Sequence, residues 1–255
     1  MVSPAPARRP ALRIGCAGWS IPAAQADRFP GPGTHLARYA QVLDAVEINS
    51  SFYRPHRPQT YRRWAESVPA QFRFSVKMPR TISHEQRLRA PADEALVPFL
   101  DAVAELGDRL GALLLQLPPS LRFDAALADR FFGALRARHA GPVACEPRHG
   151  SWFDAPATAL LRRHRIARVG ADPARVPRAA LPAADRGVEY LRLHGSPRIY
   201  YDAYRPDALD ALARRLMRVS ARTGERWCIF DNTALGHAAA DALALIERLR
   251  AHEQP

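Results

Sequence analysis

The chain has 255 residues, of which 47% are hydrophobic and 24% are charged, as in ordinary globular proteins. It contains no run of roughly 20 apolar residues that could cross a membrane. Its N-terminus lacks the apolar segment of a secretory signal, so we expect a cytoplasmic protein without a membrane partner. The net charge of +12 comes almost entirely from arginines spread along the sequence, which by itself defines no nucleic-acid-binding face.

Short apolar segments alternate with longer segments of helical periodicity, a pattern typical of βα units and a parallel sheet. The proline-rich residues 1–10 are predicted to form a flexible N-terminal arm, and residues 11–253 a single domain. Strands are predicted at 12–19, 45–49, 72–78, 111–118, 143–148, 167–172, 188–195 and 226–232. Helices, with an apolar residue every three or four positions, are predicted at 35–43, 58–68, 99–110, 127–139, 159–165, 207–221 and 237–252.

The segment between the sixth and seventh predicted strands breaks this pattern. It contains Pro173, Pro177 and Pro182, which are incompatible with a regular helix. Eight strands and seven helices in a chain of this length predict an α/β fold, a single (β/α)8 TIM-type barrel with an irregular connection in place of the sixth helix. A doubly wound open sheet is the alternative, but the chain has neither a G-x-G-x-x-G nor a P-loop motif.

Polar residues stand at the carboxyl end of every predicted strand, where TIM barrels carry their active sites. Side chains alternate along a strand, so Glu146 shares a face with Arg148, and Arg192 with His194. Taken singly, each could be a structural cap or turn residue, but together they predict a polar pocket. The strand-end residues are Trp19, Ser20, Glu47, Asn49, Lys77, Gln116, Glu146, Arg148, His149, Asp172, Arg192, His194, Asp231 and Asn232.

Lys77 is the one lysine among 37 basic residues. A position that keeps lysine in an arginine-rich chain favours a compact ammonium, as a hydrogen-bond donor or an amine nucleophile, although chance survival explains it as well. Two long loops border the predicted pocket and are candidate lids. The first, residues 79–94, offers His84, and the second, residues 196–207, offers several tyrosines including Tyr201.

Three cysteines, Cys16, Cys145 and Cys228, lie far apart in predicted strands. Cysteine is among the most frequently buried residues, and the spacings lack the C-x-x-C pairs of zinc and redox sites. We therefore expect three buried free thiols.

Seven stretches of the sequence, taken in order, resemble the "domain of unknown function 72" family, also called YecE-like. They are "GCAGW", "VEINSSFYR", "FRFSVKMPRTISHEQRL", "LLLQLPP", "EPRHGSW", "YLRLHG" and "FDNTALGHAAADA". The resemblance implies a TIM-type barrel and no established reaction. It implies as motif residues Trp19, Glu47, Asn49, Lys77, His84, Gln116, Glu146, Arg148, His149, Arg192, His194 and Asn232.

The chain departs from that family pattern at two positions. Asp231 precedes Asn232 where the family favours a pair of asparagines, which puts in doubt any role that needs an amide at position 231. Ser83 precedes His84 where threonine is commoner.

The predicted pocket mixes carboxylates, cations and histidines, which suits a small anionic or sugar-like ligand that is phosphorylated or polyhydroxylated. We expect an enzyme with hydrolase- or isomerase-like general acid/base chemistry, Glu146 or His194 being the first choice for that role. The candidate catalytic residues are Glu146, His194, Lys77, Glu47 and Asp172. The candidate substrate-binding residues are Trp19, Asn49, His84, Gln116, Arg148, His149, Arg192, Asp231, Asn232 and Tyr201.

Three alternatives remain open at this point. A divalent metal could bind Glu146, Asp172 and His194, although neighbouring cations oppose it. Lys77 could form a Schiff base with a carbonyl substrate. The chain could also be a nucleic-acid-binding or phosphodiester-processing barrel that uses its basic surface, in which case its affinity would fall steeply with salt.

Overall fold

A computed structural model describes residues 12–89, 91–218 and 224–253, and the arm predicted at residues 1–10 lies outside them. The described residues form a ten-stranded sheet. Its strands are β1 (Leu12–Ala17), β2 (Ala45–Ile48), β3 (Arg73–Lys77), β4 (Leu110–Gln116), β5 (Val143–Glu146), β6 (Ala167–Arg168), β7 (Gly170–Asp172), β8 (Ala183–Ala184), β9 (Val188–Leu193) and β10 (Glu225–Phe230).

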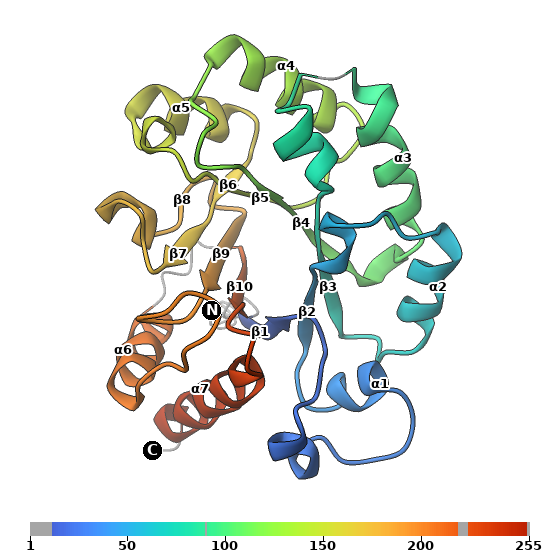
Figure 1. The fold of residues 1–255 in the computed structure, drawn as a ribbon, viewed down its shortest axis with the longest axis vertical. Helices are drawn as coiled ribbons and strands as arrows, with labels where there is room; N and C mark the ends of the chain where they lie inside the picture. The colour runs from blue at the N-terminus through green and yellow to red at the C-terminus, as the bar shows by residue number, and fades with distance from the viewer. Residues whose placement is uncertain (1–11, 90, 219–223, 254–255) are drawn as a thin grey trace, which may run out of the picture.

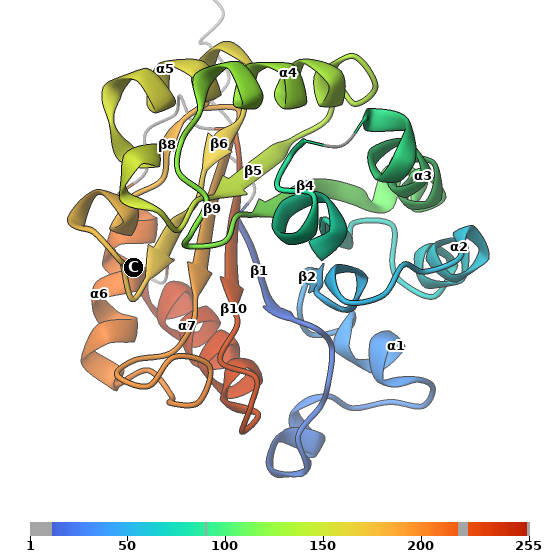
Figure 2. The same ribbon diagram turned by 45° about the horizontal axis from the view of Figure 1, so that its top comes forward.

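The sheet closes into a ring of parallel strands. β6 and β7 are the two halves of the predicted sixth strand, since β6 pairs with β5 and β7 pairs with β9. β9 and β10 run side by side in the same direction (Figure 2), and β10 pairs with β1. Only β8 departs from this arrangement among the described strands, lying antiparallel to β6. The chain therefore folds as the predicted TIM-type (β/α)8 barrel.

Helices form an outer layer around the strands (Figure 1). They are α1 (His35–Tyr39), α2 (Pro58–Glu66), α3 (Ala92–Ala104), α4 (Ala125–Arg136), α5 (Ala155–Arg163), α6 (Pro206–Met217) and α7 (His237–Glu253). The connection after β7 contains only a 3₁₀ turn (Pro177–Ala180) and the short β8, which confirms the predicted irregular segment. No helix in the described ranges is long and apolar enough to span a bilayer.

The predicted start of one helix was wrong. α3 begins at Ala92 rather than at Phe99, and Pro98 lies inside it. Leu96 and Phe99 are buried while Pro98 is exposed, so the proline ring faces solvent instead of ending the helix. The apolar stripe thus outweighs the local cost of the missing backbone N–H.

The interior of the barrel has an apolar floor beneath a polar upper layer. The rings of Tyr190 and Trp227 stack with centroids 5.8 Å apart, and both side chains are buried. Gly111 leaves room for this floor, because a Cβ there would lie 2.3 Å from the Trp227 ring. Tyr190 is two residues before Arg192 on β9, so both face inward, and the floor supports the polar layer directly.

The three cysteines are buried free thiols, as predicted. Burial raises the pKa of Cys16 and of Cys228 to about 12. Such thiols are neutral at physiological pH and act as small apolar side chains in the core.

Candidate functional site

Arg192 is the centre of a buried charge cluster, which we define as Arg192, Glu47, Glu146, His194 and Asp231. Its guanidinium is fully buried. It binds Glu47 through two hydrogen bonds, Nε to Oε2 at 3.0 Å and Nη2 to Oε1 at 2.7 Å. It also donates to Glu146 at 2.6 Å and to Asp231 at 2.9 Å. Strands β2, β5, β9 and β10 are therefore joined at their carboxyl ends by one cation.

His194 lies between two carboxylates of the cluster. Its Nδ1 is 2.9 Å from Asp231 and its Nε2 is 3.2 Å from Glu146. Burial alone would lower the pKa of His194, but these two carboxylates raise it above its ordinary value. Each ring nitrogen lies within hydrogen-bonding distance of a carboxylate oxygen, an arrangement that favours the doubly protonated, cationic ring.

The cluster also favours the charged form of two of its carboxylates, Glu146 and Asp231. Burial alone would raise the pKa of Glu146, but Arg192, His194 and Arg148 together hold it well below its ordinary value. Burial alone would also raise the pKa of Asp231, but Arg192 and His194 lower it below its ordinary value. Glu146 has no oxygen left for a substrate, since one accepts from Arg148 and His194 and the other from Gln116 and Arg192.

Lys77, the last residue of β3, is the exception to this pairing. It is only 4% exposed, and its ammonium lies 4.2 Å from the centre of the Phe52 ring. No described residue gives that ammonium a hydrogen bond or an ion pair. Burial and the neighbouring Arg192 lower the pKa of Lys77 to about 8, against the opposing effect of the carboxylates.

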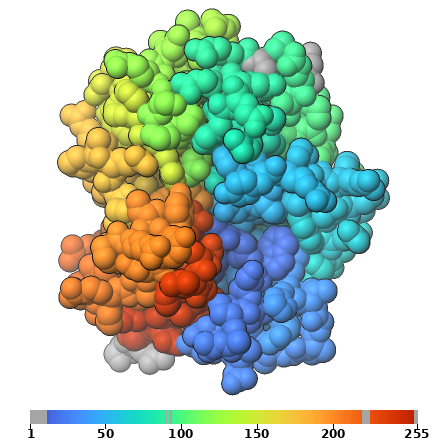
Figure 3. Space-filling model, in the orientation of Figure 1, coloured from blue at the N-terminus to red at the C-terminus, as the bar shows by residue number. Residues whose placement is uncertain are grey.

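Lys77 faces a cavity of about 400 Å³, which we call the mouth cavity. Phe52, from the segment after β2, and Tyr200, from the loop after β9, contribute to its walls. These two segments, light blue and orange, border each other in Figure 3. The predicted residues that line it are Asn49, Lys77, His84, Gln116 and Asp231.

Two residues that line the mouth cavity, His84 and Asn49, are in unusual local structures or environments. His84 belongs to a π-helical turn, Thr81–Glu85, a rare element that is frequent at functional sites. Burial and the cations around it, Lys77 first, lower the pKa of His84 below its ordinary value. The Oδ1 atom of Asn49 is buried without a hydrogen-bond partner among the described residues, which is rare for a buried acceptor.

A second cavity, of about 320 Å³, lies beside the cluster under the loops after β7 and β9. Arg148 lines this cavity, whereas Tyr200 lines the mouth cavity. Arg148 donates to the Tyr200 hydroxyl at 3.1 Å, so this hydrogen bond separates the two spaces. Tyr200 has a φ of 73°, a left-handed conformation that is costly for a residue with a side chain.

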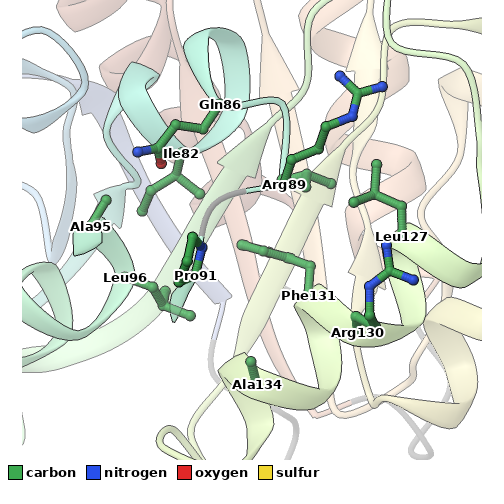
Figure 4. Close-up of a pocket in the computed structure, with 11 residues that line it drawn as sticks. Ile82, Gln86, Arg89, Pro91, Ala95, Leu96, Leu127, Arg130, Phe131 and Ala134 are labelled. Atoms are coloured by element: carbon green, nitrogen blue, oxygen red, sulfur yellow. The ribbon is translucent and has the colours of Figure 1, made fainter. Parts of the chain in front are cut away.

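Another hollow, of about 310 Å³, lies on the outer side of the barrel between α3 and α4 (Figure 4). Leu96, Leu127 and Phe131 form much of its wall, with Arg89 and Arg130 beside them. It contains none of the predicted site residues, and these apolar residues belong to the packing of the helices on the sheet.

Asp172, predicted to be catalytic, does not join the cluster. Its register partner is Leu193, whereas Ala171 pairs with Arg192. Partners across a parallel ladder face the same side of the sheet, so Ala171 points inward and Asp172 outward, where it is exposed. Of the three predicted metal ligands, Glu146 and His194 lie 3.2 Å apart, but Asp172 does not join them. The described residues contain no group of three or more His, Cys, Asp or Glu side chains arranged to hold a metal.

Four predicted binding residues lie outside the charge cluster and line neither of the two cavities beside it. Trp19 packs edge to face on Trp64, with centroids 5.0 Å apart. The His149 ring accepts from the backbone of Ser151 and caps a short turn. The other two hold loops or face solvent: Asn232 donates to Asp202 and Asp241, and Tyr201 is stacked under Arg198.

Sequence reasoning missed two residues that shape the site, Tyr190 and Phe52, and it chose Tyr201 among the loop tyrosines where Tyr200 lines the cavity. Tyr190 donates to Glu47 and lies 2.8 Å from Ser75, and its position two residues before Arg192 was a signal that could have identified it. Phe52 lies in a short helical turn directly after β2. Tyr200 rather than Tyr201 reaches the cavity, a choice set by the loop backbone, for which the sequence offers no signal.

The sequence is similar to one protein family and to several individual proteins. The family model described as "Protein of unknown function DUF72" matches residues 13–255. UPF0759 protein YecE of Escherichia coli K12 is 39% identical over 85 residues, a match that spans only 33% of this chain and 31% of that relative. UPF0759 protein YunF of Bacillus subtilis 168 is 22% identical and covers 93% of this chain and 94% of its own.

Solved structures agree with the fold. A DUF72 family protein of Enterococcus faecalis V583 superimposes with a TM-score of 0.77 at 22% identity, covering 94% of this chain and 95% of its own. A DUF72 family protein of Thermotoga maritima gives a TM-score of 0.77 at 23% identity, covering 94% and 99%. The chain therefore belongs to the DUF72 family of proteins of unknown function.

Proposed function

We propose that this protein is an enzyme that binds a small anionic substrate, phosphorylated or polyhydroxylated, in the mouth cavity. It would act on that substrate by general acid/base catalysis. The observation that carries the proposal is Lys77, whose side chain is only 4% exposed and whose ammonium lines the cavity without a hydrogen-bonding or ionic partner among the described residues. A largely desolvated charge is stabilised by a partner of opposite sign, and a bound anion would supply one.

The charge balance of the site also favours an anion. While Lys77 is protonated, four buried or half-buried cations face three carboxylates; the residues counted are Arg148, Arg192, His194, Lys77, Glu47, Glu146 and Asp231. The low dielectric of a buried site strengthens the attraction of the excess positive charge for a ligand. Arg80, at the exposed edge of the cavity, is paired with Glu85 at 3.1 Å and adds no net charge to this balance.

Hydroxyl groups on the substrate would meet suitable acceptors. Gln116 and Asp231 line the cavity, and their side chains carry oxygen acceptors for such hydroxyls. An anion held at Lys77 with hydroxyls at Gln116 and Asp231 corresponds to a sugar phosphate or a similar polyol anion.

We assign proton transfer to Lys77 and His84 instead of Glu146 and His194, which the sequence favoured. All polar atoms of Glu146 and His194 are occupied within the cluster, and the pKa of Glu146 is held well below its ordinary value. The pKa of Lys77, lowered to about 8, lies near physiological pH, where a general acid/base works best. The charge cluster then fixes the strand ends on which the cavity is built.

Binding of inorganic phosphate, measured by isothermal titration calorimetry, tests this proposal. We expect the wild-type protein to bind phosphate with an affinity that falls as pH rises through about 8, where Lys77 loses its charge. Lys77→Met should weaken binding at least roughly tenfold. Arg198→Met, which removes an exposed cation stacked on Tyr201, is the control and should leave the affinity unchanged. Equal affinity in Lys77→Met and the wild type would reject Lys77 as the anion site.

A second function, binding of a nucleic acid or a phosphodiester, is favoured by exposed aromatic residues near the cavity. Tyr53 lines the cavity and is 68% exposed, and the Arg198 guanidinium lies 3.8 Å from the centre of the Tyr201 ring. Such side chains stack on bases. In this case single-stranded DNA should bind with an affinity that falls steeply with salt, and Tyr53→Ala should weaken it. Binding insensitive to both salt and Tyr53→Ala in a fluorescence-anisotropy titration would count against this function.

A further inference from the structure

We propose that Lys77 is a covalent catalyst whose ε-amine forms an imine with the carbonyl carbon of a small anionic ketone or aldehyde, with His84 moving the protons. This inference rests on the proposed anionic substrate and specifies its reactive group. It makes the mouth cavity a site for carbonyl compounds that also carry a phosphate or a carboxylate.

The geometry places amine, imidazole and ligand space together. The Lys77 nitrogen lies 4.2 Å from the centre of the Phe52 ring, and the His84 ring packs edge to face on that same ring at 5.0 Å. All three side chains line the mouth cavity of about 400 Å³. A carbonyl compound in this cavity would therefore meet a nucleophile and a proton carrier on one wall.

The residue type is informative as well. An arginine at position 77 would supply positive charge for an anion, and the chain has 37 basic residues of which only this one is a lysine. A guanidinium remains protonated and cannot attack a carbonyl, whereas a desolvated lysine can. Because no described residue pairs with the Lys77 ammonium, its nitrogen need not break a hydrogen bond with the protein to react.

The protonation states suit this chemistry. Burial and Arg192 lower the pKa of Lys77 to about 8, so a useful fraction of neutral amine exists near pH 7. Burial and nearby cations lower the pKa of His84, which keeps its ring neutral and able to accept a proton. The Nδ1 atom of His84 lies 2.8 Å from the Ser83 hydroxyl, which leaves Nε2 for the proton transfer.

The reaction balances without an oxidant or a reductant. The amine lone pair forms the N–C bond while the carbonyl π pair moves to oxygen. His84 carries one proton from the nitrogen to that oxygen, giving a carbinolamine. One further proton from solvent, passed through His84, lets the hydroxyl leave as water, and the nitrogen lone pair forms the C=N bond. The protonated imine then withdraws electrons from the adjacent carbon, whose proton becomes acidic, as isomerase-like chemistry requires.

The test is reductive trapping of the full-length protein with sodium borohydride. The probes are pyruvate and dihydroxyacetone phosphate, two small anionic carbonyl compounds. We expect mass spectrometry and peptide mapping to find one reduced adduct on Lys77, in at least roughly tenfold excess over the adduct on the amino terminus of the chain, which reports unselective amine reactivity. Inorganic phosphate should protect Lys77 from trapping and leave the terminal amine unaffected.

Two variants separate this inference from the function on which it rests. Lys77→Arg keeps the positive charge but cannot form an imine, so it should lose the adduct and bind phosphate more tightly than Lys77→Met does. His84→Gln should still form its adduct on Lys77, but at least roughly tenfold more slowly than the wild type. Phosphate binding by the wild type without a selective Lys77 adduct for either probe would overturn the imine and leave the anion site standing. Absence of phosphate binding together with absence of the adduct would overturn both.

Discussion

Replacing Arg192 by leucine is expected to lower the free energy of unfolding by about 3–5 kcal/mol, the usual cost of leaving buried charges without their partner. The guanidinium is fully buried, and Glu47, Glu146 and Asp231, which it joins, are each no more than 4% exposed. Without it, three carboxylates would repel one another in a low-dielectric interior. Urea denaturation at pH 7 measures the loss.

The loss of unfolding free energy in Arg192→Leu, relative to the wild type, should be smaller at acidic pH. Arg192 helps to hold the pKa values of Glu146 and Asp231 below their ordinary values of 4.5 and 3.8. The stability they contribute is present above those ordinary values and disappears as pH falls through the folded-state pKa values. The difference in unfolding free energy between Arg192→Leu and the wild type should therefore decrease below about pH 4.5.

Arg205→Leu is the matched control for this prediction. Arg205 also pairs with a carboxylate, Asp207, at 3.0 Å, but the two side chains are 80% and 70% exposed. Solvent screens such a pair, so the denaturation midpoint should hardly move. An Arg192→Leu protein as stable as the Arg205→Leu protein would show that the charge cluster does not hold the strand ends together.

The sequence predicted an open pocket rather than a closed charge cluster, but the convergence of these side chains could be predicted because it depends on two short-range rules. Side chains alternate along a strand, and the carboxyl ends of parallel strands meet at one end of a barrel. These rules bring Glu47, Glu146, Arg192 and His194 together without any knowledge of loops. They failed at Asp172, because the sixth strand was given the wrong phase: the inward positions are those of Val169 and Ala171.

The mouth cavity was harder to predict because loop backbones build much of it. The choice of Tyr200 over Tyr201 depends on a left-handed residue in the loop after β9. His84 reaches the cavity through a π-helical turn, which no simple periodicity indicates. The use of His149 as a turn cap likewise depends on where the chain bends after β5. The pairing within the cluster, which leaves Lys77 as the unpartnered cation among the described residues, needs coordinates rather than a residue pattern.

Replacing Lys77 by methionine is expected to raise the free energy of unfolding at pH 7, by about 1–3 kcal/mol. Burial and Arg192 reduce the pKa of Lys77 from 10.5 to about 8, and a reduction of that size corresponds to about 3 kcal/mol as an upper limit. Methionine has a similar length, and it fills the same space beside Phe52 without a charge. A residue whose removal stabilises the fold while phosphate binding and trapping are lost is kept for function rather than for structure.

The pH dependence of the stability gained in Lys77→Met tests whether burial of the Lys77 ammonium is its cause. Below about pH 8 Lys77 is charged in both the folded and the unfolded chain, so the folded protein carries the full cost of burying the ammonium. Between about 8 and 10.5 only the unfolded chain keeps the proton, and wild-type stability rises relative to the variant. The difference should vanish above about pH 10.5, and groups that titrate in both proteins cancel from it. Lys77→Arg keeps the charge and should show no gain at any pH. A Lys77→Met protein less stable than the wild type at pH 7 would mean that the surrounding residues already stabilise the ammonium. In that case Lys77 would not need a bound anion, and the argument for an anion site would be rejected.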